Sequence, residues 1–306
     1  MDSNISFRKI RSVSNTEYVK WILDARMILF LSLNIFIFDY VTRVMIDNSE
    51  KMGKPINVIE PFIAISNSSL LLFVMPVVFL ALISDFPKSD GNAMFYMIRT
   101  GKVNWFLGQM LFAVKAGLTY VGAIFVISCG CVMSHSYIYN EWSDVVYKYY
   151  KYFPNDTENL MLELISERLY NNLTPLEALV HTTCLLMLMI MMIALVQLLA
   201  FSYSVKIAGL LANICMLCIG IGTTLFSGVV KWIFPVSNAV TWMHYDEIFK
   251  KQIVPIRNSY LYFIVIITVL VVWNAFMFKR YDFSKVKDLE DKCENHADAL
   301  ILHTAN

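Results

Sequence analysis

The sequence has few charged residues. Only 16% of its 306 residues are charged and 58% are hydrophobic, whereas a soluble domain carries about a quarter charged residues. A water-exposed surface cannot hide so large an apolar share. Lys and Arg (25) nearly balance Asp and Glu (24), so the composition gives no basic excess that would indicate nucleic-acid binding.

Motifs of catalysis and cofactor binding are also missing. No G-x-x-x-x-G-K-[ST] segment is present, so the chain has no backbone cradle for nucleotide phosphates. His181 stands alone, without a His-Glu-x-x-His motif or a carboxylate pair, and Cys215-x-x-Cys218 lies inside an apolar run, where cysteine behaves as a small hydrophobe. We therefore expect no catalytic residues, no metal and no cofactor in this chain.

Long apolar runs are what the sequence does contain. A membrane-spanning helix needs about 20 mostly apolar residues. The first 26 residues are polar and lack a signal-peptide pattern, so we expect the first run to be retained and to direct insertion. The pattern predicts an all-α, polytopic membrane protein, a single transmembrane domain over 1–306, with six spans at 27–46, 62–83, 105–132, 179–203, 207–234 and 260–278.

Lys and Arg in the connections predict the orientation. The N-terminal segment, the 84–104 loop, the 204–206 turn and the 279–306 tail together hold fourteen of them, and the other connections hold ten. Cytoplasmic loops carry the excess. We therefore expect a multi-pass protein of the cell (cytoplasmic) membrane with both termini in the cytoplasm and the long 133–178 loop outside.

Two connecting segments have a distinctive layout. Residues 15–26 form an amphipathic stretch that we expect to lie along the inner membrane surface. Residues 237–257 are too short and too polar to span, which predicts a re-entrant or interfacial segment before the last span. Between the second and third spans the chain reads Ser84-Asp-Phe-Pro, then a short helix-compatible run, then Arg99-Thr-Gly-Lys-Val-Asn-Trp105.

This layout resembles the permease subunits of ABC-2 type ABC transporters. The resemblance covers nearly the whole chain in layout. It implies a dimer with a second or related permease copy, together with cytoplasmic ABC ATPase subunits that bind the ATP and Mg²⁺. It also implies that the loop after the second span carries a coupling helix, about 90–102 here, which docks on the ATPase through Met94, Phe95, Met97, Ile98, Arg99 and Lys102. The alternative is an interfacial helix that rests on lipid headgroups.

Charged groups within spans are costly and often functional. Asp39 and Lys115 lie roughly 18 and 15 Å from the inner boundary of their spans, at ~1.5 Å per residue. We predict that they form an ion pair, with Arg43 as a competitor; alternatively, Lys115 lines a polar cavity without a specific partner. In the family the segment before the last span closes the outer end of the path, which makes the following residues candidates for an outer gate: Trp242, His244, Asp246 and Glu247.

The function that these observations favour is export of an amphipathic substrate, such as a lipid, peptide or drug, driven by ATP hydrolysis in a partner subunit. The alternatives are an ion-coupled secondary transporter and the membrane component of a sensor complex. A secondary transporter normally has sequence-related halves, and no convincing repeat relates 27–132 to 179–278. An intramembrane enzyme would need paired catalytic groups, which the sequence lacks.

Overall fold

The computed structural model describes residues 5–88, 91–156, 164–224, 228–246 and 251–280. Within these ranges the chain is almost wholly helical. Its elements, in chain order, are α1 (Phe7–Ile22), α2 (Met27–Ile37), η1 (Phe38–Thr42), α3 (Arg43–Met52), β1 (Ile56–Asn57), α4 (Glu60–Asn67), α5 (Leu71–Leu82), α6 (Gly91–Thr100), α7 (Lys102–Cys131), η2 (Met133–His135), β2 (Ser136–Tyr137), α8 (Asp144–Tyr152), α10 (Glu167–Tyr170), α11 (Pro175–Ser202), α12 (Lys206–Thr224), η3 (Val230–Ile233), α13 (Pro235–Ala239), η4 (Trp242–His244) and α14 (Ile256–Arg280).

The predicted all-α membrane fold is confirmed. In the described part of the chain, five continuous helices are long and apolar enough to cross a membrane: Met27–Met52, which joins α2, η1 and α3, and the helices α7, α11, α12 and α14. The bent pair α4–α5 is the sixth candidate span. The protein is therefore a polytopic helical membrane protein.

The second span is broken where a continuous helix over 62–83 was expected. Helices α4 and α5 meet at an angle of 83°. The break follows the polar run Ser66-Asn67-Ser68-Ser69, and Ser68 has an extended backbone (φ −69°, ψ 130°). Short polar side chains compete for backbone hydrogen bonds and so weaken a helix at such a point. The Asn67 amide, for example, donates to the Ile63 carbonyl at 2.9 Å.

Two other spans differ in length from their predictions. The first continues to Met52, and its 26 residues extend about 39 Å at 1.5 Å per residue, more than the ~30 Å hydrocarbon core. It ends at Gly53, whose φ of 59° is left-handed. The fifth span was predicted over 207–234, but α12 ends at Thr224 and a separate short 3₁₀ turn occupies Val230–Ile233.

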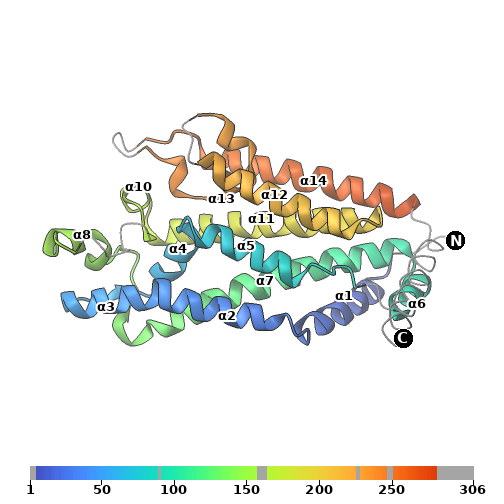
Figure 1. Ribbon diagram of the computed structural model, residues 1–306, viewed down its shortest axis with the longest axis horizontal. Helices are drawn as coiled ribbons and strands as arrows, with labels where there is room; N and C mark the ends of the chain where they lie inside the picture. Colours follow the sequence, from blue (N-terminus) through green and yellow to red (C-terminus); the bar gives the residue numbers. More distant parts are fainter. Residues whose placement is uncertain (1–4, 89–90, 157–163, 225–227, 247–250, 281–306) are drawn as a thin grey trace, which may run out of the picture.

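Helix α11 is the centre of the bundle. Of its most apolar window, 61% is buried inside the chain, compared with 17% for α14 and 22% for α12, which leaves much of α12 and α14 to face lipid or a partner. Figure 1 shows an elongated molecule with α6, the start of α1 and the end of α14 at one end, and with α3, α8 and α10 at the other. We call these the α6 end and the α8 end.

Helix α1 runs alongside α7 instead of lying apart from the bundle. The Ser6 N–H donates to Asn104 Oδ1 at 2.9 Å, and the Tyr18 hydroxyl bonds the Thr119 hydroxyl at 2.7 Å. The two helices therefore run side by side in the same direction. Gly108 permits this contact, because a Cβ there would lie 2.7 Å from the Val13 side chain. The amphipathic stretch predicted over 15–26 begins earlier, and its apolar face packs on a spanning helix.

At the α8 end, a small lobe from the 133–178 loop sits on the extended first span. Strands β1 and β2 pair in parallel, and Glu60 lies beneath them with no exposed surface. Its carboxylate accepts hydrogen bonds from the N–H of Ser143 (2.6 Å), the hydroxyl of Ser143 (2.7 Å) and the N–H of Asn57 (3.0 Å). This buried carboxylate fastens the lobe to the start of α4.

Candidate functional site

The loop before α6 is tied to the spans by a cluster of charges. The Arg26 guanidinium pairs with the Asp85 carboxylate and donates to the Ser84 hydroxyl (2.9 Å). Lys88 pairs with Asp24, and this contact together with the Arg26 N–H holds the pKa of the Asp24 carboxyl below its ordinary value. The loop 84–88 is thereby fixed to the turn between α1 and α2.

The same loop is also fixed to the turn between α11 and α12. The Lys206 ammonium donates to the carbonyl oxygens of Pro87 (2.7 Å) and Asp85 (3.3 Å), and the Gln197 amide donates to the Ser84 carbonyl (3.0 Å). A short segment that leads directly into α6 therefore holds two separate helix pairs together. We call residues 84–88 with these partners the loop junction.

Helix α6 contains most of the predicted coupling residues, and their surroundings differ. Ile98 is 65% exposed and Arg99 is also exposed, but Met97 is only 4% exposed and packs into the core. Met97 was expected among the docking contacts; instead its side chain is occupied within this chain. The side chains of Met94 and Phe95 lie outside the described part of the chain. Lys102 is the first residue of α7.

The structure does not bring Asp39 and Lys115 together. The Asp39 carboxylate pairs with Arg43, one turn further along the same helix, at 3.0 Å, and both side chains are well exposed. Lys115 donates to Asn15 Oδ1 on α1 at 2.6 Å. Because α1 runs alongside α7, it supplies Lys115 with a polar partner that the sequence did not reveal.

The segment before the last span is folded against the bundle at the α8 end. Trp242 donates its indole N–H to the Asn67 carbonyl at 3.0 Å, and Arg168 lies over its ring. His244 is fully buried: its Nδ1 bonds the Val254 carbonyl at 3.0 Å, and its Nε2 lies 3.3 Å from the Ser259 hydroxyl. Burial lowers the pKa of His244, which favours the neutral imidazole.

Of the other two candidate gate residues, Asp246 lies where the backbone pairs antiparallel with residues 251–253, and Glu247 lies outside the described residues. The Asp246 N–H donates to the Lys251 carbonyl at 2.8 Å, and the Ile253 N–H donates to the His244 carbonyl at 2.8 Å. The segment 237–257, predicted to be re-entrant or interfacial, thus contains the end of α13, the 3₁₀ turn η4 and this backbone pairing.

Sequence reasoning missed a buried polar cluster at the break between α4 and α5. The Asn67 amide donates to the Thr182 hydroxyl (3.2 Å), which in turn bonds the Thr241 hydroxyl (3.0 Å). All three residues are buried. The cluster links the broken span to α11 and to the start of η4. The run Ser66–Ser69 inside an apolar span was the available signal.

A second set of amides joins the spans nearer the α6 end. Asn213 of α12 donates to the Ile193 carbonyl at 3.3 Å, and Asn274 of α14 donates to the Leu195 carbonyl at 3.2 Å. Each bond ends on α11 within one turn. Such bonds hold transmembrane helices in register. These two bonds therefore join α12 and α14 to the same turn of α11.

The contacts described above are hydrogen bonds and ion pairs that join helices to one another and to the connecting loops. Among the described residues, no group of three or more His, Cys, Asp or Glu side chains could hold a metal ion. Neither a known protein family, nor a curated protein, nor a solved structure matches the chain.

Proposed function

We propose that the chain is the membrane-spanning subunit of an ABC transporter of the ABC-2 permease type, which exports an amphipathic substrate. Two copies, or this chain and a related permease, would pair with two cytoplasmic ATPase subunits that bind ATP and Mg²⁺. The α6 end and both termini would face the cytoplasm, and the α8 end would face the outside.

The observation that carries the proposal is the loop junction with α6 beside it. A helix that transmits force from a partner needs an accessible surface and a stiff attachment to the spans. Ile98 and Arg99 supply exposed apolar and cationic groups. The attachment is the junction, where Arg26 and Lys206 reach the loop from two different helix pairs. A displacement of α6 would therefore move α1–α2 and α11–α12 together.

In the proposed permease, the segment α13–η4 would form the gate at the outer side of the membrane. It rests on the break between α4 and α5 through the bond from Trp242 to Asn67. Broken helices at membrane depth are tolerated where they are buried in protein or line a path. In the proposed permease, Trp242, His244 and Asp246 would form the gate on the substrate's exit.

The test is purification of the tagged chain from its native host in mild detergent, followed by identification of partners and an ATPase assay. We expect a stoichiometric partner with a Walker-motif ATPase, lost in Ile98→Asp. Val229→Asp is the matched control, because Val229 is also an exposed apolar residue (82% exposed) but lies at the α8 end. A folded preparation without any ATPase partner would refute the proposal and favour an ion-coupled transporter or a sensor component.

A further inference from the structure

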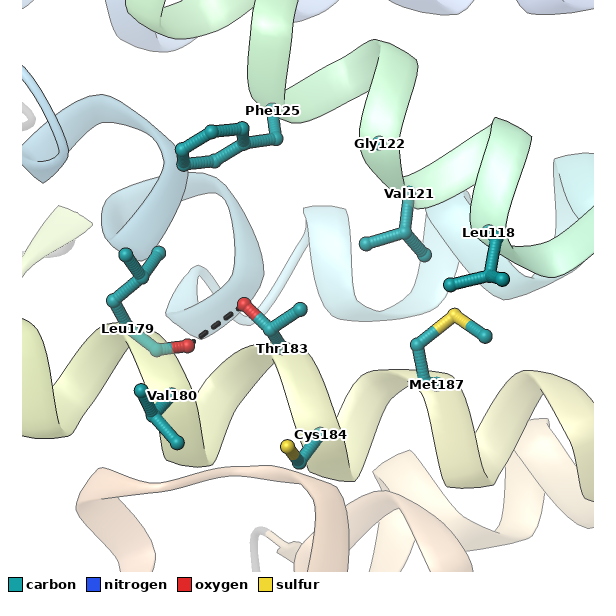
Figure 2. A pocket seen from close by; sticks show the side chains of 9 residues that line it. All are labelled: Leu118, Val121, Gly122, Phe125, Leu179, Val180, Thr183, Cys184 and Met187. Atoms are coloured by element: carbon teal, nitrogen blue, oxygen red, sulfur yellow. Dashed lines mark hydrogen bonds between the residues drawn. The ribbon is translucent and has the colours of Figure 1, made fainter.

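An apolar groove lies between α7 and α11, outside the polar clusters described above. Its volume is about 380 Å³. Figure 2 shows Leu118, Val121 and Phe125 on one wall, and Leu179 and Met187 on the other. All of these side chains are hydrocarbon or thioether.

The few polar atoms of the lining are weak or already engaged. The Thr183 hydroxyl donates to the Leu179 carbonyl at 2.7 Å, within its own helix (Figure 2). The Cys184 thiol is a weak donor and a weak acceptor. A polar ligand would lose hydrogen bonds to water on entering such a groove and would recover almost none. The lining therefore selects a hydrocarbon.

The groove lies within the membrane and opens toward lipid. Leu179 and Met187 are four and twelve residues from Pro175, where α11 begins, or roughly 6 and 18 Å along the helix. The groove thus occupies the half of the bilayer at the α8 end. Its rim residues Leu118 and Val180 are 57% and 52% exposed, so the groove is continuous with the lipid-facing surface.

The groove is too small to take in a whole helix but large enough for a hydrocarbon chain. A helix with side chains is about 10–12 Å wide, so two turns occupy roughly 850–1,200 Å³. The groove is less than half of that volume. It is nevertheless more than twice the ~150 Å³ of an apolar cavity that holds benzene. Gly122 contributes to the space, because no atom lies within 4 Å of the position that a Cβ would take.

We propose that this groove is a binding site for one acyl chain of a bilayer lipid from the leaflet at the α8 end. The acyl chain would lie lengthwise between α7 and α11, and the headgroup of the lipid would lie at the membrane surface near the start of α11. An acyl chain in the groove contacts protein on several sides, whereas an acyl chain on a convex helix face contacts protein on one side. The lipid in the groove would therefore stay bound longer than the lipids around it. This site does not depend on the proposed ATPase partner.

Photolabelling tests the proposal on the full chain, reconstituted without a partner. The vesicles contain phosphatidylcholine with a small fraction of phosphatidylcholine that carries a diazirine in the middle of one acyl chain. After irradiation and digestion, mass spectrometry quantifies label on residues 118–125 and 179–187 relative to the exposed face of α14. We expect about tenfold more label per exposed residue in the groove, which corresponds to a preference of about 1.4 kcal/mol.

Gly122→Leu should fill the groove and reduce its label to the level of α14. Gly130→Leu is the matched control, because Gly130 is exposed on the same helix, has open space around it and lies outside the groove; it should label like the wild type. If Gly122→Leu fails to fold, Val180→Phe at the rim should have the same effect. Equal label on the groove and α14, or label unchanged in the filled variant, would overturn the proposal. So would groove label that is present on the monomer but lost where two copies of the protein associate, because a second copy would then occupy the groove.

Discussion

Gly209 provides a sharp test of the packing between α11 and α12. A Cβ at this position would lie 2.3 Å from the Ala200 Cβ and 3.0 Å from Gln197 Oε1. The Ala200 Cβ is attached directly to its helix and cannot rotate away. Carbon atoms pack best at about 3.5–4.0 Å, so Gly209→Ala has to push the two helices apart by more than about 1 Å.

The size of the effect follows from three contributions. Overpacking of a tight contact costs about 1–3 kcal/mol, and the short distance here belongs at the upper end. Separation of the helices also lengthens the hydrogen bond from the Gln197 amide to the Lys206 carbonyl, which is 3.3 Å in the structure. Loss of this hydrogen bond costs about 1 kcal/mol. Alanine in place of glycine favours the helix by about 1 kcal/mol. We expect a net loss of about 2–3 kcal/mol in the free energy of unfolding.

Gly222→Ala is the control on the same helix, because no atom lies within 4 Å of its Cβ position. The assay is unfolding of both variants by SDS titration, followed by circular dichroism. Gly222→Ala should equal the wild type or exceed it slightly, whereas Gly209→Ala should unfold at a lower SDS fraction. If the two variants are equally stable, the close approach of α11 and α12 at Gly209 is refuted.

Three further perturbations test the ends of the molecule. Glu60→Ala should lower the free energy of unfolding by about 2–5 kcal/mol, because the buried donors of Ser143 lose their acceptor. The unfolding temperature should fall with it. Glu60→Gln keeps one acceptor oxygen and should lose less stability. The Asp24–Lys88 pair should contribute at most about 1 kcal/mol of stability, present above the ordinary Asp pKa of 3.8 and lost as pH falls through the lowered folded value. Lys88→Met should reduce this acid dependence in a series of unfolding measurements, while the part due to the Arg26 N–H stays. The lowered pKa of His244 predicts that stability declines as pH falls below the ordinary value of 6.5, because the unfolded chain binds the proton first. His244→Gln should abolish that part of a pH series, and an unchanged series would contradict the assignment.

Hydrophobic runs predicted the helices well, because a spanning helix is determined locally by length and composition. The predicted third and sixth spans, 105–132 and 260–278, agree with α7 and α14 to within four residues at each end. The break at Ser68 was not predicted, because the mean hydropathy over 62–83 stays high across four small polar residues. Its geometry depends on Thr182 and Trp242, which the chain supplies more than a hundred residues later.

The site residues were harder to predict, because their roles depend on which helices are neighbours. The predicted pairing of Asp39 with Lys115 rested on their similar depths along two spans, and depth alone does not say which helix faces meet. The sequence stretch around Met97 shows an apolar run without showing which side is buried. In the structure Met97 faces the core and Ile98 faces outward, so only the second can contact a partner.

Helix α11 connects the α6 end of the molecule to the α8 end. Gln197 contacts the loop junction at the α6 end, and Thr182 belongs to the polar cluster beneath η4 at the α8 end. The two residues are fifteen positions apart on one continuous helix, or roughly 22 Å, and this helix is the most buried of the five continuous spans. A buried helix cannot bend freely, because its neighbours would have to repack. In the proposed permease, a shift of the loop junction along α11 would therefore reach Thr241 and Trp242 directly, and the amide bonds from Asn213 and Asn274 would carry α12 and α14 along with it.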